Sequence, residues 1–363
     1  MGCILAIESS CDETAAAVVD ERLRVRASVV ASQHDLHAEY GGVVPEIASR
    51  AHLERVLPVI RKALDDARIS IAEIEGVAAG VRPGLIGSLL VGAAAAKGLA
   101  WARGLPFYGV DHVVAHLFAG LAAREGEPAP EARVPALGLV VSGGHTSLFR
   151  ISGPREVELL GRTIDDAVGE ALDKAATMLG LPHPGGPSLE KLAAGGDPDA
   201  LRFALPRLPS ALDFSLSGMK TKLLYEVRGV PEGRGASARF PRSLDDVSPE
   251  RRRDLAASVQ HGVFAQVIDR LSRAAELLSP QTLLVGGGVV ANRSLRAMLE
   301  DWTRARDIAL VLPRPEHCVD NAAMIALHAQ LRRRVGDLGD DLSEPVEAVS
   351  TLARGLRGKG VRA

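Results

Sequence analysis

The sequence predicts a duplicated α/β fold, and three polar or glycine-rich turns predict it. Residues 3–20 (CILAIESSCDETAAAVVD) and 136–152 (ALGLVVSGGHTSLFRIS) both have the pattern of a strand, a polar turn and a second strand. A third turn, in 282–300, connects a buried strand through the glycines 286–288 to a helix. Each hairpin stands at the start of a segment with helical patterns, and the two segments are of similar length. We therefore expect two α/β halves.

Length and composition limit the classes of protein. A chain of 363 residues favours two domains. With 43 Lys and Arg against 45 Asp and Glu, any contact with nucleic acid must use a local basic patch. Aromatic residues make up 3% of the chain, too few for a base-stacking platform. Three cysteines cannot form a disulfide framework and fit a reducing compartment.

No segment has the pattern of a membrane anchor. The N-terminal segment reaches an acid at Glu8, which is not typical of a signal peptide. The longest apolar helical run, 84–96, stops at Lys97 and is too short to span a bilayer. We therefore expect a cytoplasmic protein that does not bind membranes.

The elements follow in order along the chain. Helices are predicted over 45–67, 87–102 and 163–180, the last with a capping box of Thr163 and Asp166. Residues 228–254 hold seven arginines and many turn formers, which predicts a mobile surface loop. We expect lobes over 1–130 and 131–335 and a basic tail over 336–363. Solubility explains the composition of the loop and the tail more simply than contacts with nucleic-acid phosphates.

Two histidines stand in the apolar segment 109–120. His112 and His116 are four residues apart, so a helix places both rings on one face. They are either hydrogen-bonded core histidines or two ligands of one metal ion. Val113 stands where a zinc protease of the HExxH type has its glutamate, which argues against that class. Asp320 is a candidate third ligand, with helix N-capping as the alternative, and three such ligands leave coordination positions open.

The glycine turns are candidate ligand contacts. Ser142, Gly143 and Gly144 lie at a hairpin tip, where glycine lets a ligand approach backbone N–H groups. Residues 286–292 could hold a nucleotide where a strand leads into a helix, although neither the Walker loop nor the dinucleotide spacing is present. Tight turns without a ligand remain the alternative. Asp12 and Glu13, in the first turn, either face solvent or face a cation or phosphate.

Eight segments in this order resemble one family. They are ESSCDET, HAEYGGVVPEIASRAH, DHVVAHLFA, LVVSGGHTSL, TIDDAVGEALDKAATMLGLPHPGGP, FSLSGMKT, LLVGGGVVANRSLR and CVDNAAMIA. They are similar to the tRNA N6-adenosine threonylcarbamoyltransferase family, called TsaD or Gcp. The resemblance implies the actin/Hsp70/sugar-kinase fold, with two lobes around a nucleotide cleft. It implies transfer of threonylcarbamoyl from threonylcarbamoyl-AMP to N6 of adenosine at tRNA position 37, in tRNAs reading codons that start with A, with release of AMP.

The resemblance also implies site residues and partners. One divalent metal per subunit, usually iron and alternatively zinc, would be bound by His112, His116 and Asp320. Asp12 matches the acid important for catalysis, and Glu13, a second catalytic candidate, follows it. We nominate Asp12 as the base that takes the proton of the amine. The expected substrate contacts are Val140, Val141, Ser142, Gly143, Gly144, Asp173, Gly186, Asn292 and Glu190, where some members have Asp. The implied partners are tRNA, the paralogue TsaB and the ATPase TsaE.

One departure and several alternatives stay open at this point. Arg82 in RPGL replaces a glycine that is common in the family, so contacts with a partner at that turn are in doubt. A small-molecule kinase of the same fold class would need ATP as phosphoryl donor. A non-catalytic scaffold paralogue would lack the histidine pair that this chain retains. A metalloprotease would need the missing glutamate.

Overall fold

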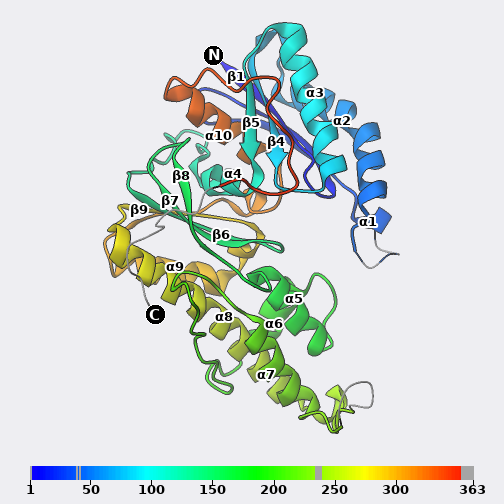
Figure 1. The fold of residues 1–363 in the computed structure, drawn as a ribbon, viewed down its shortest axis with the longest axis vertical. Helices are drawn as coiled ribbons and strands as arrows, with labels where there is room; N and C mark the ends of the chain where they lie inside the picture. The colour runs from blue at the N-terminus through cyan, green and yellow to red at the C-terminus, as the bar shows by residue number, and fades with distance from the viewer. Residues whose placement is uncertain (1, 38–39, 41, 234–238, 353–363) are drawn as a thin grey trace.

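The strands form two sheets of the same design. The computed structural model describes residues 2–37, 40, 42–233 and 239–352, and within these residues there are two five-stranded sheets (Figure 1). The first has the order β3-β2-β1-β4-β5, with β1 antiparallel to β2 and parallel to β4. Its strands are β1 (Cys3–Glu8), β2 (Glu13–Val19), β3 (Val25–Ser32), β4 (Ile74–Arg82) and β5 (Phe107–Asp111).

The second sheet repeats this design. Its order is β10-β9-β6-β7-β8, with β6 antiparallel to β7 and parallel to β9. Its strands are β6 (Ala136–Val141), β7 (Thr146–Ile151), β8 (Val157–Arg162), β9 (Thr282–Gly286) and β10 (Ala309–Val311). The repeated meander with parallel strands added on one side confirms the predicted duplicated α/β fold.

Helices cover both faces of the first sheet because its central strands β1 and β4 are buried on both sides, whereas the edge strand β3 is partly exposed. In β1 all six residues are buried. Helices α2 (Pro45–Ala67) and α3 (Ile86–Arg103) pack on one face, through residues such as Val59 and Ala96. On the other face lie α4 (His112–Phe118) and α10 (Ala322–Arg334). The short α1 (His34–His37) follows β3.

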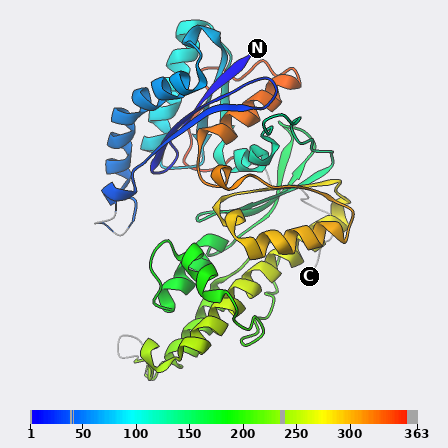
Figure 2. The ribbon, with the colours of Figure 1, turned by 180° about the vertical axis from the view of Figure 1, so that it is seen from behind.

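Helices α4 and α10 lie between the two sheets, as both views show (Figures 1 and 2). One apolar cluster joins Ile4 of β1, Leu117 of α4, Val140 of β6 and Ile325 of α10, all fully buried. The two lobes therefore share a core through the helix that carries the histidine pair.

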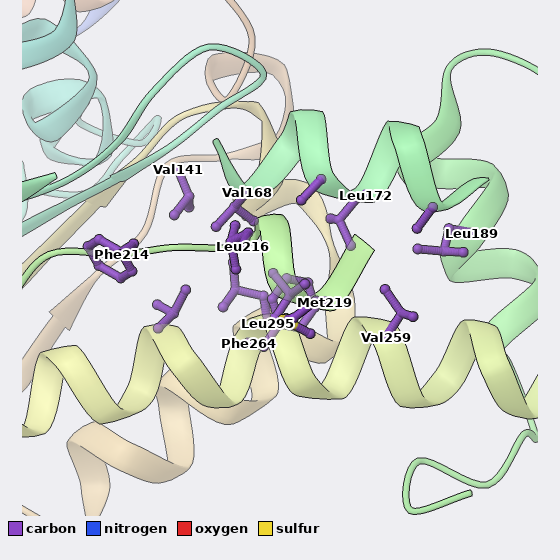
Figure 3. Packing of buried hydrophobic residues seen from close by; sticks show 14 of the residues in the cluster. Val141, Val168, Leu172, Leu189, Phe214, Leu216, Met219, Val259, Phe264 and Leu295 are labelled. Carbon is purple, nitrogen blue, oxygen red and sulfur yellow. The ribbon is translucent and has the colours of Figure 1, made fainter. Parts of the chain in front are cut away.

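The second lobe contains the remaining helices, packed on the other face of its sheet. Figure 3 shows Val168 and Leu172 of α5 facing Val259 and Phe264 of the long helix α8. The helices are α5 (Val168–Met178), α6 (Gly185–Ala193), α7 (Ser217–Arg228), α8 (Pro249–Leu278) and α9 (Arg293–Arg304). Single 3-10 turns lie at Ile71–Glu73, Ala119–Leu121, Leu244–Asp246, Gly288–Ala291 and Pro315–His317.

Two segments differ from the sequence prediction. The helix predicted over 163–180 begins only at Val168, because Thr163 Oγ1 donates to the Asp166 carbonyl oxygen in a turn before the helix. The arginine-rich segment 228–254 is not all loop: Ser248 caps α8, so residues 249–254 are helical. Residues 234–238 of that segment lie outside the described part of the chain, and its mobility stays a prediction.

The C-terminal part of the chain returns to the first lobe. Helix α10 packs against the first sheet, although it was assigned by sequence to the second lobe. Residues 336–352, here called the C-terminal strap, hold acidic but no basic residues and run along β4 and β5, where the Asp340 N–H donates to the Phe107 carbonyl oxygen. The prediction of a basic tail is therefore wrong for 336–352, which are acidic and hydrogen-bonded to the first lobe. Residues 353–363 lie outside the described part of the chain. The division at 130 and 335 remains a proposal.

None of the described helices is both long enough and apolar enough to cross a bilayer.

Candidate metal centre and donor cavity

The histidine pair lies at the start of α4, directly after β5. Asp111 caps this helix: its Oδ1 accepts from the Val113 N–H (3.0 Å) and the Val114 N–H (3.1 Å). His112 and His116 are consequently one turn apart on one face, with ring centroids 4.9 Å apart at 85°. Both rings are buried, which fits the apolar sequence around them.

Asp320 reaches this pair from the turn before α10. Its Oδ1 lies 3.1 Å from His116 Nε2 and 3.5 Å from His112 Nε2. The N-capping alternative for Asp320 is wrong, because the neighbouring Asn321 caps α10 by accepting from the Met324 N–H (3.1 Å). One candidate ligand atom from each of the three side chains lies within 4.8 Å of the others, close enough for one cation.

The chemistry of this triad fits a metal ion. His116 is 1% exposed, and among the described residues neither of its ring nitrogens forms a hydrogen bond, although Nε2 lies 3.1 Å from Asp320 Oδ1. A buried polar atom without a partner is costly, and coordination of a cation would remove that cost. Two imidazole nitrogens and one carboxylate oxygen suit Fe²⁺ and Zn²⁺ alike.

Charge inside the triad is strongly coupled. Burial opposes the charged form of His112, but the carboxylates of Asp320 and Glu8 raise the pKa of His112 well above its usual value. Burial also opposes ionisation of Asp320, yet His112 and His116 hold the pKa of Asp320 well below its usual range. The triad is therefore arranged to hold positive charge between two rings and a carboxylate.

A cavity of about 570 Å³ opens above this triad. Asp12 and Glu13 line it, together with His112 and Asp320, so the acids of the first turn do face the metal candidate. Burial, and then the negative charge of Asp12, raise the pKa of Glu13 to about 8. Glu13 is thus mainly protonated at neutral pH and can donate a hydrogen bond.

A second, narrower cavity of about 170 Å³ adjoins the first. Gly143 and Gly288 line both cavities, so the two spaces meet at the hairpin tip and the glycine turn after β9. An added Cβ at either glycine would meet no atom within 4 Å, which leaves their backbone open to a ligand.

Five predicted substrate contacts line this second cavity, and three of these side chains already have structural partners. Asp173 Oδ1 accepts from the Gly186 N–H (3.0 Å), and Glu190 Oε1 accepts from the Arg293 N–H (2.9 Å). Asn292 caps α9 and donates from Nδ2 to Gln260 Oε1 (2.9 Å). The five residues are Gly143, Asp173, Gly186, Glu190 and Asn292.

Four further predicted contacts come from the strand β6 and the turn after it. Ser142 and Gly144 line the first cavity, as Gly143 between them also does. Val140 and Val141 are fully buried inside β6 and line neither cavity, because both sides of that strand are covered by core. Only their backbone could contribute to a site, through the geometry of the turn that follows.

The chain matches one known family over most of its length. The family TsaD, described as tRNA N6-adenosine threonylcarbamoyltransferase, matches residues 24–327 of the chain. The chain belongs to this family. As a member of the TsaD family it is an acyltransferase, and the kinase and scaffold alternatives are not favoured.

Similar proteins of this name cover almost the whole chain. The protein named tRNA N6-adenosine threonylcarbamoyltransferase in Sorangium cellulosum is 45% identical over 99% of this chain and 99% of its own length. The protein of that name in Trichlorobacter lovleyi is 48% identical over 96% of each chain.

Solved structures of more distant proteins support the actin-like, two-lobed fold. HypF from T. kodakarensis matches with a TM-score of 0.61 at 15% identity, over 93% of this chain and 49% of HypF. Component A of (R)-2-hydroxyglutaryl-CoA dehydratase from Acidaminococcus fermentans matches with a TM-score of 0.50 at 13% identity, over 91% of this chain and 98% of its own.

Two residues of this TsaD family member were missed by sequence reasoning. His145 lines the cavity at the hairpin tip, and burial, then the charges of His112 and His116, lower its pKa to about 4. Its place directly after Ser-Gly-Gly was a usable signal. Ala348 of the C-terminal strap also lines the cavity, but nothing in its sequence context indicates this.

Proposed function

We propose that this chain transfers the threonylcarbamoyl group from threonylcarbamoyl-AMP to N6 of the adenosine next to the anticodon, and releases AMP. The meeting of the two cavities carries the proposal: one holds the acids and the metal candidate, and the other is bordered by glycine turns. In this arrangement the narrow cavity takes the donor and the wide cavity admits the acceptor base. Because tRNA is the substrate, we place the reaction in the cytoplasm.

His112, His116 and Asp320 would hold one divalent ion, iron or zinc. When bound, that ion supplies Lewis-acid stabilisation of the negative charge on the leaving phosphate. The backbone N–H groups at Gly143 and Gly144 would add hydrogen bonds to the same charge, since their surroundings are open. Asp173 accepts a hydrogen bond from the Gly186 N–H, and since both residues line the donor cavity, this bond supports the shape of the cavity.

The acids of the first turn would act on the acceptor. The N6 lone pair attacks the carbonyl carbon of the donor, the bond from that carbon to the phosphate oxygen breaks, and AMP leaves. We assign the amine proton to the carboxylate of Asp12, which lines the cavity beside the triad. Glu13, mainly protonated at neutral pH, would instead donate a hydrogen bond to the substrate.

An apolar surface on the first lobe is consistent with a protein partner. On α2, Leu53 and Leu57 are 65% and 58% exposed, and on α3, Leu90 and Trp101 are 52% and 76% exposed. The two helices lie side by side on the outer face of the sheet (Figure 1). We propose that the TsaB-like paralogue docks on this α2–α3 face, and that the TsaE-like ATPase completes the assembly with tRNA.

The test is the transfer of labelled threonine to tRNA by the chain with its purified partners, ATP and bicarbonate. We expect transfer by the wild type and at least about a hundred-fold loss in His112→Ala. His261→Ala is the matched control, since His261 is exposed on α8, far along the chain from the triad. Normal transfer by His112→Ala would contradict the proposed role of the metal centre. Phosphorylation of a sugar in place of transfer would favour a kinase.

A further inference from the structure

Glu8 is a buried carboxylate that the proposed reaction leaves unused. It is the last residue of β1 and is 1% exposed. Its Oε1 accepts from the Ser10 N–H (2.6 Å), whereas its Oε2 has no hydrogen bond among the described residues and lies 3.2 Å from His112 Nδ1. Burial of a carboxylate is costly unless its partners compensate for the lost water. The contact with His112 is therefore expected to stabilise either the fold or the geometry of the site.

The neighbouring strand leaves space for this carboxylate. Gly80 lies in β4, and a Cβ added there would come within 2.6 Å of Glu8 Oε2. Any larger residue at position 80 would push against the oxygen that faces His112. Glycine at this point of a buried strand is otherwise unfavourable, since it weakens the strand and packs no side chain. The absence of a side chain at Gly80 thus leaves the space that the Glu8 carboxylate occupies.

The two ring nitrogens of His112 have different surroundings. Nε2 faces Asp320 Oδ1 at 3.5 Å, on the side of the proposed cation. Nδ1 faces Glu8 Oε2, and also Ser10 Oγ at 3.1 Å. A carboxylate only accepts hydrogen bonds, so both nitrogens can carry a proton without the metal; when a cation takes the lone pair of Nε2, the remaining proton belongs on Nδ1, which faces Glu8. Ser10 could either donate or accept, and therefore does not by itself select the tautomer.

We propose that Glu8 is a positioning residue, which holds His112 with its proton on Nδ1 so that Nε2 is free to bind the metal ion. This inference rests on the metal site proposed above. The proposed role of Glu8 distinguishes the two histidines, since His116 Nδ1 has no hydrogen-bond partner among the described residues, whereas His116 Nε2 faces Asp320 at 3.1 Å. Carboxylates behind a ligating histidine strengthen metal binding by about ten- to a hundred-fold.

The test measures metal binding, not catalysis. Co²⁺ is titrated into the metal-free chain in competition with a chelator, and exchangeable imidazole N–H signals of the Co²⁺-loaded chain are followed by proton NMR. Glu8→Gln keeps the shape but removes the charge, and Glu8→Asp keeps the charge. Gly80→Ala keeps Glu8 and displaces its carboxylate. The controls are Glu54→Gln, an exposed carboxylate on α2, and Gly98→Ala, where a Cβ meets no atom within 4 Å.

We expect Glu8→Gln and Gly80→Ala to bind Co²⁺ about ten- to a hundred-fold more weakly and to lose one imidazole N–H signal. Glu8→Asp should recover part of the affinity, and both controls should match the wild type. Wild-type affinity and an unchanged spectrum in Glu8→Gln, or in Gly80→Ala if Glu8→Gln does not fold, would overturn the inference alone. Failure of the wild type to bind Co²⁺ would overturn the metal site and this inference with it.

Discussion

Arg82 Nε donates a hydrogen bond to Glu347 Oε2 over 2.8 Å, and the same guanidinium pairs with Glu344. This contact ties the end of β4 to the C-terminal strap. Next to it, the Glu347 N–H donates to the Val81 carbonyl oxygen, and Ala348 reaches the wall of the metal cavity. Arg82, whose role the sequence left open, thus fixes the strap beside the site.

Replacing Arg82 should loosen the strap. The side chain of Arg82 is 14% exposed, and Arg82→Ala would leave both Glu344 and Glu347 without their cation. We expect a loss of about 1–3 kcal/mol in the free energy of unfolding, measured by urea denaturation. The exposed pair of Lys62 and Asp66 gives the control, since Lys62→Ala should cost about 0.5 kcal/mol or less. Equal costs for both variants would show that the strap contact adds no stability.

Substitution by alanine should destabilise the chain at Gly286 and have little effect on its stability at Gly288. A Cβ at Gly286 would lie 2.1 Å from the carbonyl oxygen of His116, whereas a Cβ at Gly288 would meet nothing within 4 Å. Gly286→Ala must therefore push α4 away from β9, and we expect a loss of about 2 kcal/mol or more together with weaker metal binding. Thermal unfolding of both variants checks this. A stable Gly286→Ala variant with unchanged metal affinity would contradict it.

Stability should fall in mild acid because of His328. Its ring is stacked on Phe118, its Nε2 donates to the Pro154 carbonyl oxygen, and its Nδ1 has no partner among the described residues. Burial lowers the pKa of His328 from 6.5 to about 4. Between these values the unfolded chain binds the proton and the folded chain does not, so stability is complete above pH 6.5 and decreases as the pH falls toward 4.

The size of this effect can be isolated with one variant. At pH 5 the wild type should have lost about 2 kcal/mol relative to pH 7.5 through His328 alone. His328→Gln keeps a donor for the Pro154 carbonyl but cannot titrate, so its loss over the same range should be smaller by that amount. Urea denaturation at both pH values measures it. Identical pH dependence in the two proteins would show that His328 titrates normally.

Metal removal should destabilise the wild type but not variants of the triad. A cation that binds only the folded chain, present at about a hundred times its Kd, stabilises by about 2.7 kcal/mol. Added Zn²⁺ should therefore raise the Tm of the wild type, and a chelator should reverse the rise. Asp320→Ala should show little response, while His261→Ala should respond like the wild type. A full rise of the Tm in Asp320→Ala would place the bound ion elsewhere.

The α2–α3 face should be required for the paralogue and not for folding. Leu57 is 58% exposed in the chain alone, so Leu57→Asp should leave the Tm within about 1 °C. Burial of an aspartate in an apolar contact should weaken binding of the TsaB-like partner by at least about thirty-fold. Calorimetric titration of the partner measures this, with the exposed Glu54→Gln as control. If Leu57→Asp bound the partner with unchanged affinity, the partner would have to bind to another surface of the chain.

The sequence predicted the duplicated fold and the grouping of His112 with His116 because both depend on local patterns. Strand, turn and helix periodicity act over a few residues, and four-residue spacing alone places two rings on one helical face. Residue types alone made Asp320 and the glycine turns candidates, with structural alternatives, and the resemblance to one family implied their roles. The structure brings Asp320 to the two histidines and the glycine turns to one cavity. Local pattern could not decide whether Asp320 or its neighbour Asn321 caps α10, since both residue types are good caps.

Only the tertiary structure decided what depends on contacts between distant segments. In the structure, α10 and the C-terminal strap pack against the first lobe. Arg82 pairs with Glu344 and Glu347, and Glu8 lies next to the His112 ring. Ion pairs and shared cores of this kind arise where segments hundreds of residues apart meet, and no periodicity along the chain records such a meeting. The sequence by itself determined which side chains could bind a cation; packing between the lobes decided which of them lie within reach of one.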